Sequence, residues 1–209
     1  MTRELRRELR SLDNRIDETG DPSFADSDID LITDGLSADE PKTRKRAVRV
    51  LKSAPAEIVP YDRLQEALTQ VIERAIDTED NSARRAAEMA SRVIAEQHID
   101  TDFVDDTTTD LGERMLAEHN ARLRTGGAVL IDLALFGSEY QPDNTVVDNL
   151  LEHIAASELL IESFDRRLDA VQPAYLALSK LDDTHADDIA DCVERGSFDE
   201  YLHAHHDDT

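Results

Sequence analysis

Apolar residues recur along most of the chain at spacings of three and four residues, and this spacing is the period of an amphipathic α-helix. Runs of this kind predict helices over residues 27–37, 62–76 and 108–118. In the clearest run, one helical face carries Leu64, Leu68, Val71, Ile72 and Ala75. The pattern therefore predicts an all-α fold in which each helix buries one stripe against its neighbours.

The helical pattern returns after a shift of about forty residues. At this shift Leu31 aligns with Val71 and Leu111. Three further sets align in the same way: Leu36, Ile76 and Leu116; Arg44, Arg84 and Arg124; and Ala47, Ala87 and Gly127. Each unit consists of a first helix, a short polar turn and a second helix. A repeated helical hairpin is typical of a stacked α-solenoid, which acts through its surface.

The first two units share an acidic turn and an arginine early in the second helix. Asp39 and Asp80 lie in the turns, and Arg44 and Arg84 follow them. In these features residues 27–135 resemble the HEAT-repeat family. The resemblance implies a right-handed α–α superhelix of HEAT-like helical hairpins with N- and C-terminal capping helices. It also implies a structural ladder that hydrogen-bonds along the stack, formed by Asp39, Arg44, Asp80, Arg84 and Arg124, with Arg46 and Arg85 as alternative basic members.

The third unit differs from the other two. Arg124 keeps the register, but Glu118 and His119 stand in place of the acidic turn. Gly126 and Gly127 enter the second helix of this unit, and we predict that they permit a close helix crossing or break the helix. Residues 128–136 are then apolar nearly all round, which predicts a central buried helix.

The remaining chain is less regular. We predict helices over residues 144–156, 158–171 and 173–181, with Pro173 in the first turn of the third. At the other end, an N-terminal stripe of Leu5, Leu9, Leu12 and Ile16 predicts either a cap over the first repeat or a partner-binding helix. The predicted organisation is an N-terminal amphipathic helix over residues 1–22, a HEAT-like repeat domain over 23–182, and a C-terminal helix and polar tail over 183–209.

Charge changes this picture more than any motif. The chain has 47 acidic and 23 basic residues, a net charge of −24, and its four lysines stand at positions 42, 45, 52 and 180. Such a surface repels itself in ordinary salt, whereas concentrated salt shortens the repulsion to a few ångströms. We therefore predict an acidic protein from a halophilic archaeon, and overall acidity then says little about the partner.

One helix departs from the acidic composition. At 100° per residue, Lys42, Lys45, Arg46, Arg49 and Lys52 fall on one side of the helix and form what we call the basic strip, which is confined to the first unit. Arg44 lies apart, at the edge of the apolar side. The basic strip is either a binding surface for phosphates or an acidic partner, or a solvated face paired with neighbouring carboxylates. No aromatic residue interleaves with it for base stacking.

Groups for catalysis or metal binding are sparse. Cys192 is the single cysteine, and no P-loop, dinucleotide fingerprint or Glu-x-x-His pair is present. The weak candidates for a metal are the Glu118-His119 and Glu152-His153 pairs and the histidines of the tail, His203, His205 and His206. We predict no catalytic residue, no metal site and no cofactor. The chain shows no signal peptide and no membrane-spanning segment, so a cytoplasmic location is expected.

The sequence favours a non-enzymatic protein–protein interaction or scaffold module that presents a solenoid binding surface to a protein partner. The first alternative is a nucleic-acid-associated protein that uses the local basic helix face, as HEAT-like DNA glycosylases use a basic concave surface. The second alternative is a metal-dependent enzyme on a HEAT-like stack. Nothing in the sequence identifies the partner.

Overall fold

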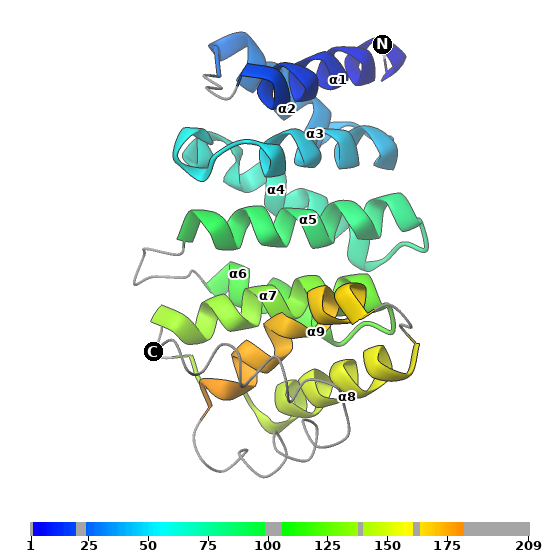
Figure 1. Ribbon diagram of the computed structural model, residues 1–209, viewed down its shortest axis with the longest axis vertical. Coiled ribbons are helices and arrows are strands. Elements are labelled where there is room, and N and C mark those ends of the chain that lie inside the picture. Colours follow the sequence, from blue (N-terminus) through cyan, green and yellow to red (C-terminus); the bar gives the residue numbers. More distant parts are fainter. Residues whose placement is uncertain (1, 20–23, 99–105, 138–139, 161–163, 182–209) are drawn as a thin grey trace.

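The computed structural model of the protein describes residues 2–19, 24–98, 106–137, 140–160 and 164–181 (Figure 1). These residues form helices and no strand, which confirms the all-α class. The elements are α1 (Thr2–Thr19), α2 (Asp26–Ser37), α3 (Pro41–Ser53), the 3-10 helix η1 (Ala56–Ile58), α4 (Tyr61–Ile76), α5 (Asn81–His98), α6 (Asp106–Leu116), α7 (Ala121–Gly137), α8 (Asn144–Leu160) and α9 (Phe164–Ser179). No described helix combines the length and the apolar character that a membrane crossing requires.

The helices stack in two rows. One row contains α1, α3, α5, α7 and α9 in that order, and the other contains α2, α4, α6 and α8. Consecutive helices pair across the rows as the hairpins α2–α3, α4–α5, α6–α7 and α8–α9. Figure 1 shows α1, α3, α5 and α7 one below the other, with α9 crossing α7 obliquely. Residues about forty positions apart therefore lie on adjacent layers of the stack.

Polar residues in the turns determine where the second helices of the hairpins begin. Pro41 is the first residue of α3, a position where its missing N–H is not needed. Asp80 Oδ1 accepts the backbone N–H groups of Ser82 and Ala83 at 2.8 and 2.9 Å, so it caps α5. Asn120 Oδ1 accepts two amides at the start of α7, at 3.1 and 3.4 Å. The hairpins are thus defined locally, before any packing between layers.

Two apolar clusters fill the space between the rows. The first extends from α1 to α7, and the second from α6 to α9. Helix α7 belongs to both, because Leu130 packs into the first cluster and Ile131 into the second. The predicted central buried helix is confirmed, although Phe136 at its end is 64% exposed. Asp132, the one charged residue of the apolar stretch 128–136, pairs with Lys180 at 2.6 Å.

Gly126 and Gly127 permit a close helix crossing, and α7 continues through them unbroken. A Cβ atom built on Gly127 would lie 2.6 Å from the backbone N of Leu116 and 2.7 Å from the carbonyl O of Gly112. Neither backbone atom can move without displacing α6. A side chain at this position would therefore force α6 and α7 apart.

The boundaries predicted for the last helices are wrong. Helix α8 continues to Leu160, and Pro173 lies inside α9 instead of in its first turn. A proline inside a helix cannot donate to the carbonyl four residues earlier, which here is that of Asp169. The Asp169 carbonyl accepts instead from Arg92 Nη2 at 2.9 Å. A tertiary contact from α5 thus replaces the missing helical hydrogen bond, and sequence periodicity contains no signal for it.

Candidate functional site

A groove of about 1840 Å³ runs along the row formed by α1, α3, α5, α7 and α9. All five helices contribute to its lining, from residues 3–10, 42–53, 81–89, 120–125 and 166–170. Its acidic members are Glu88 and Asp169. Its twelve basic members are Arg3, Arg6, Arg7, Arg10, Lys42, Lys45, Arg46, Arg49, Lys52, Arg85, Arg122 and Arg166. A strongly positive groove therefore crosses a strongly negative protein.

All five residues of the basic strip line the groove. The sequence predicted a basic strip on the first unit alone. The positive lining of the groove continues onto α1 and, in later layers, onto Arg85, Arg122 and Arg166. A local signal for the added residues exists, because each of them except Arg10 lies in the first two turns of its helix. That signal is weak by itself, since only the stacking of the helices brings these positions to one surface.

A buried carboxylate organises the α1–α3 end of the groove. Asp13 of α1 is 2% exposed and pairs with Arg46 at 2.9 Å and with Arg49 at 3.3 Å. Ser53 Oγ donates to the same carboxylate at 3.3 Å. Asp13 thus joins α1 to α3 and orients two guanidinium groups of the basic strip. The pairing of Asp13 with the basic strip could not be predicted from the sequence, because Asp13 lies next to Leu12 on an otherwise ordinary amphipathic helix.

The cations around Lys45 repel one another. Burial lowers the pKa of Lys45, and the nearby charges of Arg85, Arg46, Lys42 and Arg122 lower it further. Four of the twelve basic lining residues pair with a described carboxylate, namely Arg6, Arg46, Arg49 and Arg122. The other eight form no ion pair within the part of the chain that the structure describes. Most of the positive charge in the groove is therefore uncompensated.

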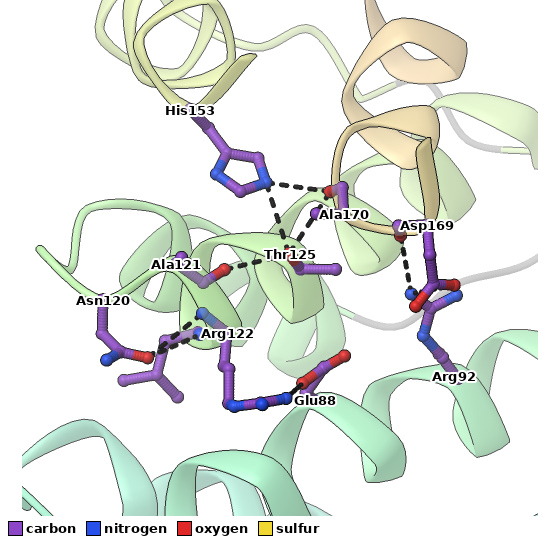
Figure 2. Close-up of polar contacts among 10 residues, drawn as sticks. Glu88, Arg92, Asn120, Ala121, Arg122, Thr125, His153, Asp169 and Ala170 are labelled. Atoms are coloured by element: carbon purple, nitrogen blue, oxygen red, sulfur yellow. Dashed lines mark hydrogen bonds and ion pairs between the residues drawn. The ribbon is translucent and has the colours of Figure 1, made fainter. Parts of the chain in front are cut away.

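The α5–α9 end is balanced by acids and hydrogen bonds (Figure 2). Glu88 pairs with Arg122 at 2.9 Å, and Asp169 pairs with Arg92 at 3.1 Å. Both pairs start from α5: Glu88 links α5 to the adjacent helix α7, and Arg92 links α5 to α9. Figure 2 shows Arg122 extended from the start of α7 toward Glu88. This end of the groove is closer to neutral than the other.

A hydrogen-bonded group lies beneath the α7–α9 part of the lining. His153 is 1% exposed, and its Nε2 lies 3.0 Å from the carbonyl of Ala170 and 3.4 Å from Thr125 Oγ1 (Figure 2). Because a carbonyl can only accept, the neutral imidazole is protonated on Nε2. Burial lowers the pKa of His153, the hydrogen bond to Ala170 raises it, and the charge of Arg124 lowers it. The hydrogen bond of His153 to Ala170 joins α8 to α9 beneath the lining.

The arginines of the predicted ladder bind carbonyl groups inside the hairpins. Arg44 Nη1 donates to the carbonyls of Ala38 and Asp39 at 2.7 and 2.8 Å. Arg124 Nε donates to the carbonyl of Glu118, which also precedes it by six residues. Both arginines are nearly buried, at 5% and 6% exposure. The structure thus places two of the basic members at equivalent positions of the first and third units.

The other members of the ladder have different surroundings. Asp80 caps α5, and its charge together with that of Asp39 raises the pKa of Arg44, although burial lowers that pKa more strongly. Arg84 Nε is buried without a hydrogen-bond partner. Arg124 extends the contacts to the next layer, because its Nη2 donates to Glu152 at 3.1 Å. A continuous Asp–Arg series along the stack remains a prediction.

No group of three or more His, Cys, Asp or Glu residues within the described ranges is arranged to hold a metal ion. Glu152 pairs with Arg124, and His153 points into the α7–α9 contact. His203, His205 and His206 and the thiol of Cys192 lie outside the described residues. Comparisons with protein-family models, with curated proteins and with solved structures found no match.

Proposed function

We propose that the protein is a binding module that holds a nucleic acid through its phosphate groups along the groove. The observation that carries this proposal is the contrast in charge. The lining contains twelve basic and two acidic residues, in a chain with a net charge of −24. Phosphate contacts from Lys and Arg supply most of the non-specific affinity for nucleic acids. The alternative ligand for the same positive groove is an acidic protein partner, as expected for a scaffold.

The distribution of lysine supports the same function. Three of the four lysines of the chain line the groove, and the fourth, Lys180, pairs with Asp132. If the acidic composition is an adaptation to concentrated salt, positive charge has been kept where it serves a ligand. Nine of the twelve cations are arginines, whose planar donor groups bind phosphate in a bidentate manner and depend less on long-range attraction.

We propose that the two rows form a HEAT-like α-solenoid. Three observations support it: the hairpins repeat at about forty residues, each packs on the next, and Arg44 and Arg124 bind the carbonyl six residues earlier in their own units. In such a stack the second helices of successive hairpins present one continuous surface. The groove lies on that surface.

The proposal is tested by charge reversal within and outside the groove. Lys42→Glu/Arg85→Glu removes two exposed lining cations that pair with no described carboxylate. Arg63→Glu/Arg114→Glu makes the same charge change at exposed positions outside the lining. Affinity for a labelled duplex is measured by fluorescence anisotropy over a salt series from about 0.1 to about 1 M, with circular dichroism at each salt to show that the helices are intact.

We expect the wild-type protein and the Arg63/Arg114 variant to bind with the same affinity and a steep salt dependence. The Lys42/Arg85 variant should bind at least about 100-fold more weakly at the lowest salt, because each phosphate contact changes the slope of log K against log salt by about 0.9. A folded wild-type protein that binds no nucleic acid at any salt overturns the proposal. So does a protein that binds acidic polypeptides but not nucleic acids, which would restore the scaffold hypothesis.

A further inference from the structure

The proposed function leaves open which form of nucleic acid occupies the groove. We infer that the groove takes a double-stranded nucleic acid, which it holds by the phosphates of both strands without reading the bases. This inference rests on the proposed function and narrows its ligand. It follows from the chemistry of the lining, from the dimensions of the charged surface and from the hydrogen bonds that the neutral polar side chains already form within the protein.

The lining lacks the residues that single strands need. None of its 21 residues is Phe, Tyr, Trp or His, and its one long apolar side chain is Met89. Proteins that bind single strands without sequence preference stack successive bases on aromatic side chains. In a duplex the bases are already stacked on one another, and the phosphates face outward. A lining of cations without aromatic side chains therefore matches the outside of a duplex.

The charged surface is broad in two directions. Packed helices lie about 8–10 Å apart, so the four steps from α1 to α9 span about 35 Å, which is close to one turn of B-form duplex. Along α3, Lys42 and Lys52 are ten residues apart, or about 15 Å. A single strand needs only a narrow track of charge. A field of these dimensions reaches phosphates on both sides of a duplex groove.

The neutral polar side chains of the lining are mostly engaged within the protein. Ser53 Oγ donates to Asp13, and Thr125 Oγ1 donates to the carbonyl of Ala121 at 2.9 Å. Asn120 Oδ1 caps α7, which leaves Asn81 as the one amide of the lining with no hydrogen bond among the described residues. Amide side chains recognise adenine at the base edges, whereas arginine and lysine bind guanine there and also bind phosphates. The cations of the groove therefore serve phosphates, and its neutral side chains offer few contacts to bases.

The test compares ligands of one sequence. A duplex of about two helical turns, the same strand alone, and a duplex of unrelated sequence are each titrated against the wild-type protein and against Lys42→Glu/Arg85→Glu at fixed salt. We expect the two duplexes to bind equally, and the single strand at least about tenfold more weakly. Shortening the duplex below about one turn should reduce affinity only moderately, because the cations of α1 and α3 still bind it while those of α7 and α9 lose their phosphates.

Each outcome separates this inference from the proposed function. A single strand that binds as tightly as the duplex, with the same loss in the Lys42/Arg85 variant, overturns the duplex assignment and leaves nucleic-acid binding intact. A large difference in affinity between the two duplexes would show that the groove reads the bases, and would overturn that part of the inference. Binding of none of the three ligands refutes the proposed function itself.

Discussion

The two ends of the groove differ in how their charges are balanced. Helices α1 and α3 supply nine of the twelve cations, whereas α5, α7 and α9 supply one each. Both acids of the lining, Glu88 and Asp169, lie at the α5–α9 end, where they pair with Arg122 and Arg92. The α1–α3 end has fewer compensating groups than cations, and Asp13 is the one buried carboxylate among them.

The difference indicates where affinity is concentrated. Like charges that gather around Lys45 destabilise the free protein, so a ligand that neutralises them gains the repulsion that it relieves. A cation that already has a carboxylate partner gains less, because binding must first break or share that pair, and six of the eight unpaired cations lie at the α1–α3 end. We therefore expect the α1–α3 end to supply most of the binding free energy and the α5–α9 end to orient the ligand.

Among these variants, Lys45→Glu should have the largest effect on duplex affinity, because it removes a cation at the α1–α3 end. At about 0.1 M salt the variant should bind duplex about 30- to 100-fold more weakly, because a phosphate would meet a carboxylate. Its free energy of unfolding should nevertheless rise, since the new carboxylate stands among Arg85, Arg46 and Lys42. Anisotropy and urea unfolding on the same preparations measure both quantities.

Arg166→Glu is the matched variant for Lys45→Glu, because it makes the same charge change on α9 at the other end of the lining. Its duplex affinity should fall by less than about fivefold. Equal losses for the two variants would show that the ends contribute equally. A lower stability of Lys45→Glu would contradict the repulsion among the four cations.

Asp13→Asn should sharpen the comparison in the opposite sense. The substitution removes the carboxylate that Arg46, Arg49 and Ser53 share, so the free energy of unfolding should fall by about 1–3 kcal/mol. Duplex affinity should rise several-fold, because two paired guanidinium groups become available for phosphates. Urea unfolding and anisotropy check the two effects, with Asp110→Asn, an exposed acid paired within α6, as the control. A variant that loses both stability and affinity would assign Asp13 a role in shaping the groove that outweighs its charge.

The smallest expected effect concerns His153 in the hydrogen-bonded group beneath the α7–α9 part of the lining. Burial lowers the pKa of His153, so the unfolded chain binds a proton more readily than the folded protein does. The stability that neutral His153 contributes is therefore fully present above its ordinary pKa of 6.5 and is lost as pH falls below that value toward the lowered pKa. The thermal midpoint of the wild-type protein should fall over this range.

The variant His153→Gln keeps a donor for the Ala170 carbonyl but cannot titrate, so its midpoint should fall less steeply with pH. His119→Gln, at an exposed histidine, should follow the wild-type curve. Thermal unfolding followed by circular dichroism across the same pH series makes the comparison. Identical curves for His153→Gln and wild type would exclude His153 as the titrating group.

Much of the fold could be predicted from local spacing. The first helices of the three units begin and end within two residues of the predicted positions. The burial of Arg44 was indicated by its place at the edge of the apolar side. The interior position of Pro173 could not be predicted, because the Arg92 side chain that compensates for the lost hydrogen bond comes from α5. Contacts of that kind leave no period in the sequence.

The site could be predicted only in part. The basic strip was visible because five cations lie on one face of one helix. The sequence contains the arginines of α1 and of the later layers, but it does not show that they lie on the same surface as the basic strip. Their sum depends on which helices stack and in what order, and therefore on contacts between helices about forty residues apart in the chain.

The sequence by itself determined the helices, the forty-residue hairpin and the face that each helix buries, because these depend on apolar spacing within a few turns. The tertiary structure alone decided that the cations of five separate helices line one groove, that Asp13 holds two of them, and that the acids of the lining lie at its far end. The physical reason is range: helix periodicity is a local property, whereas an electrostatic surface is the sum of charges that only packing brings together.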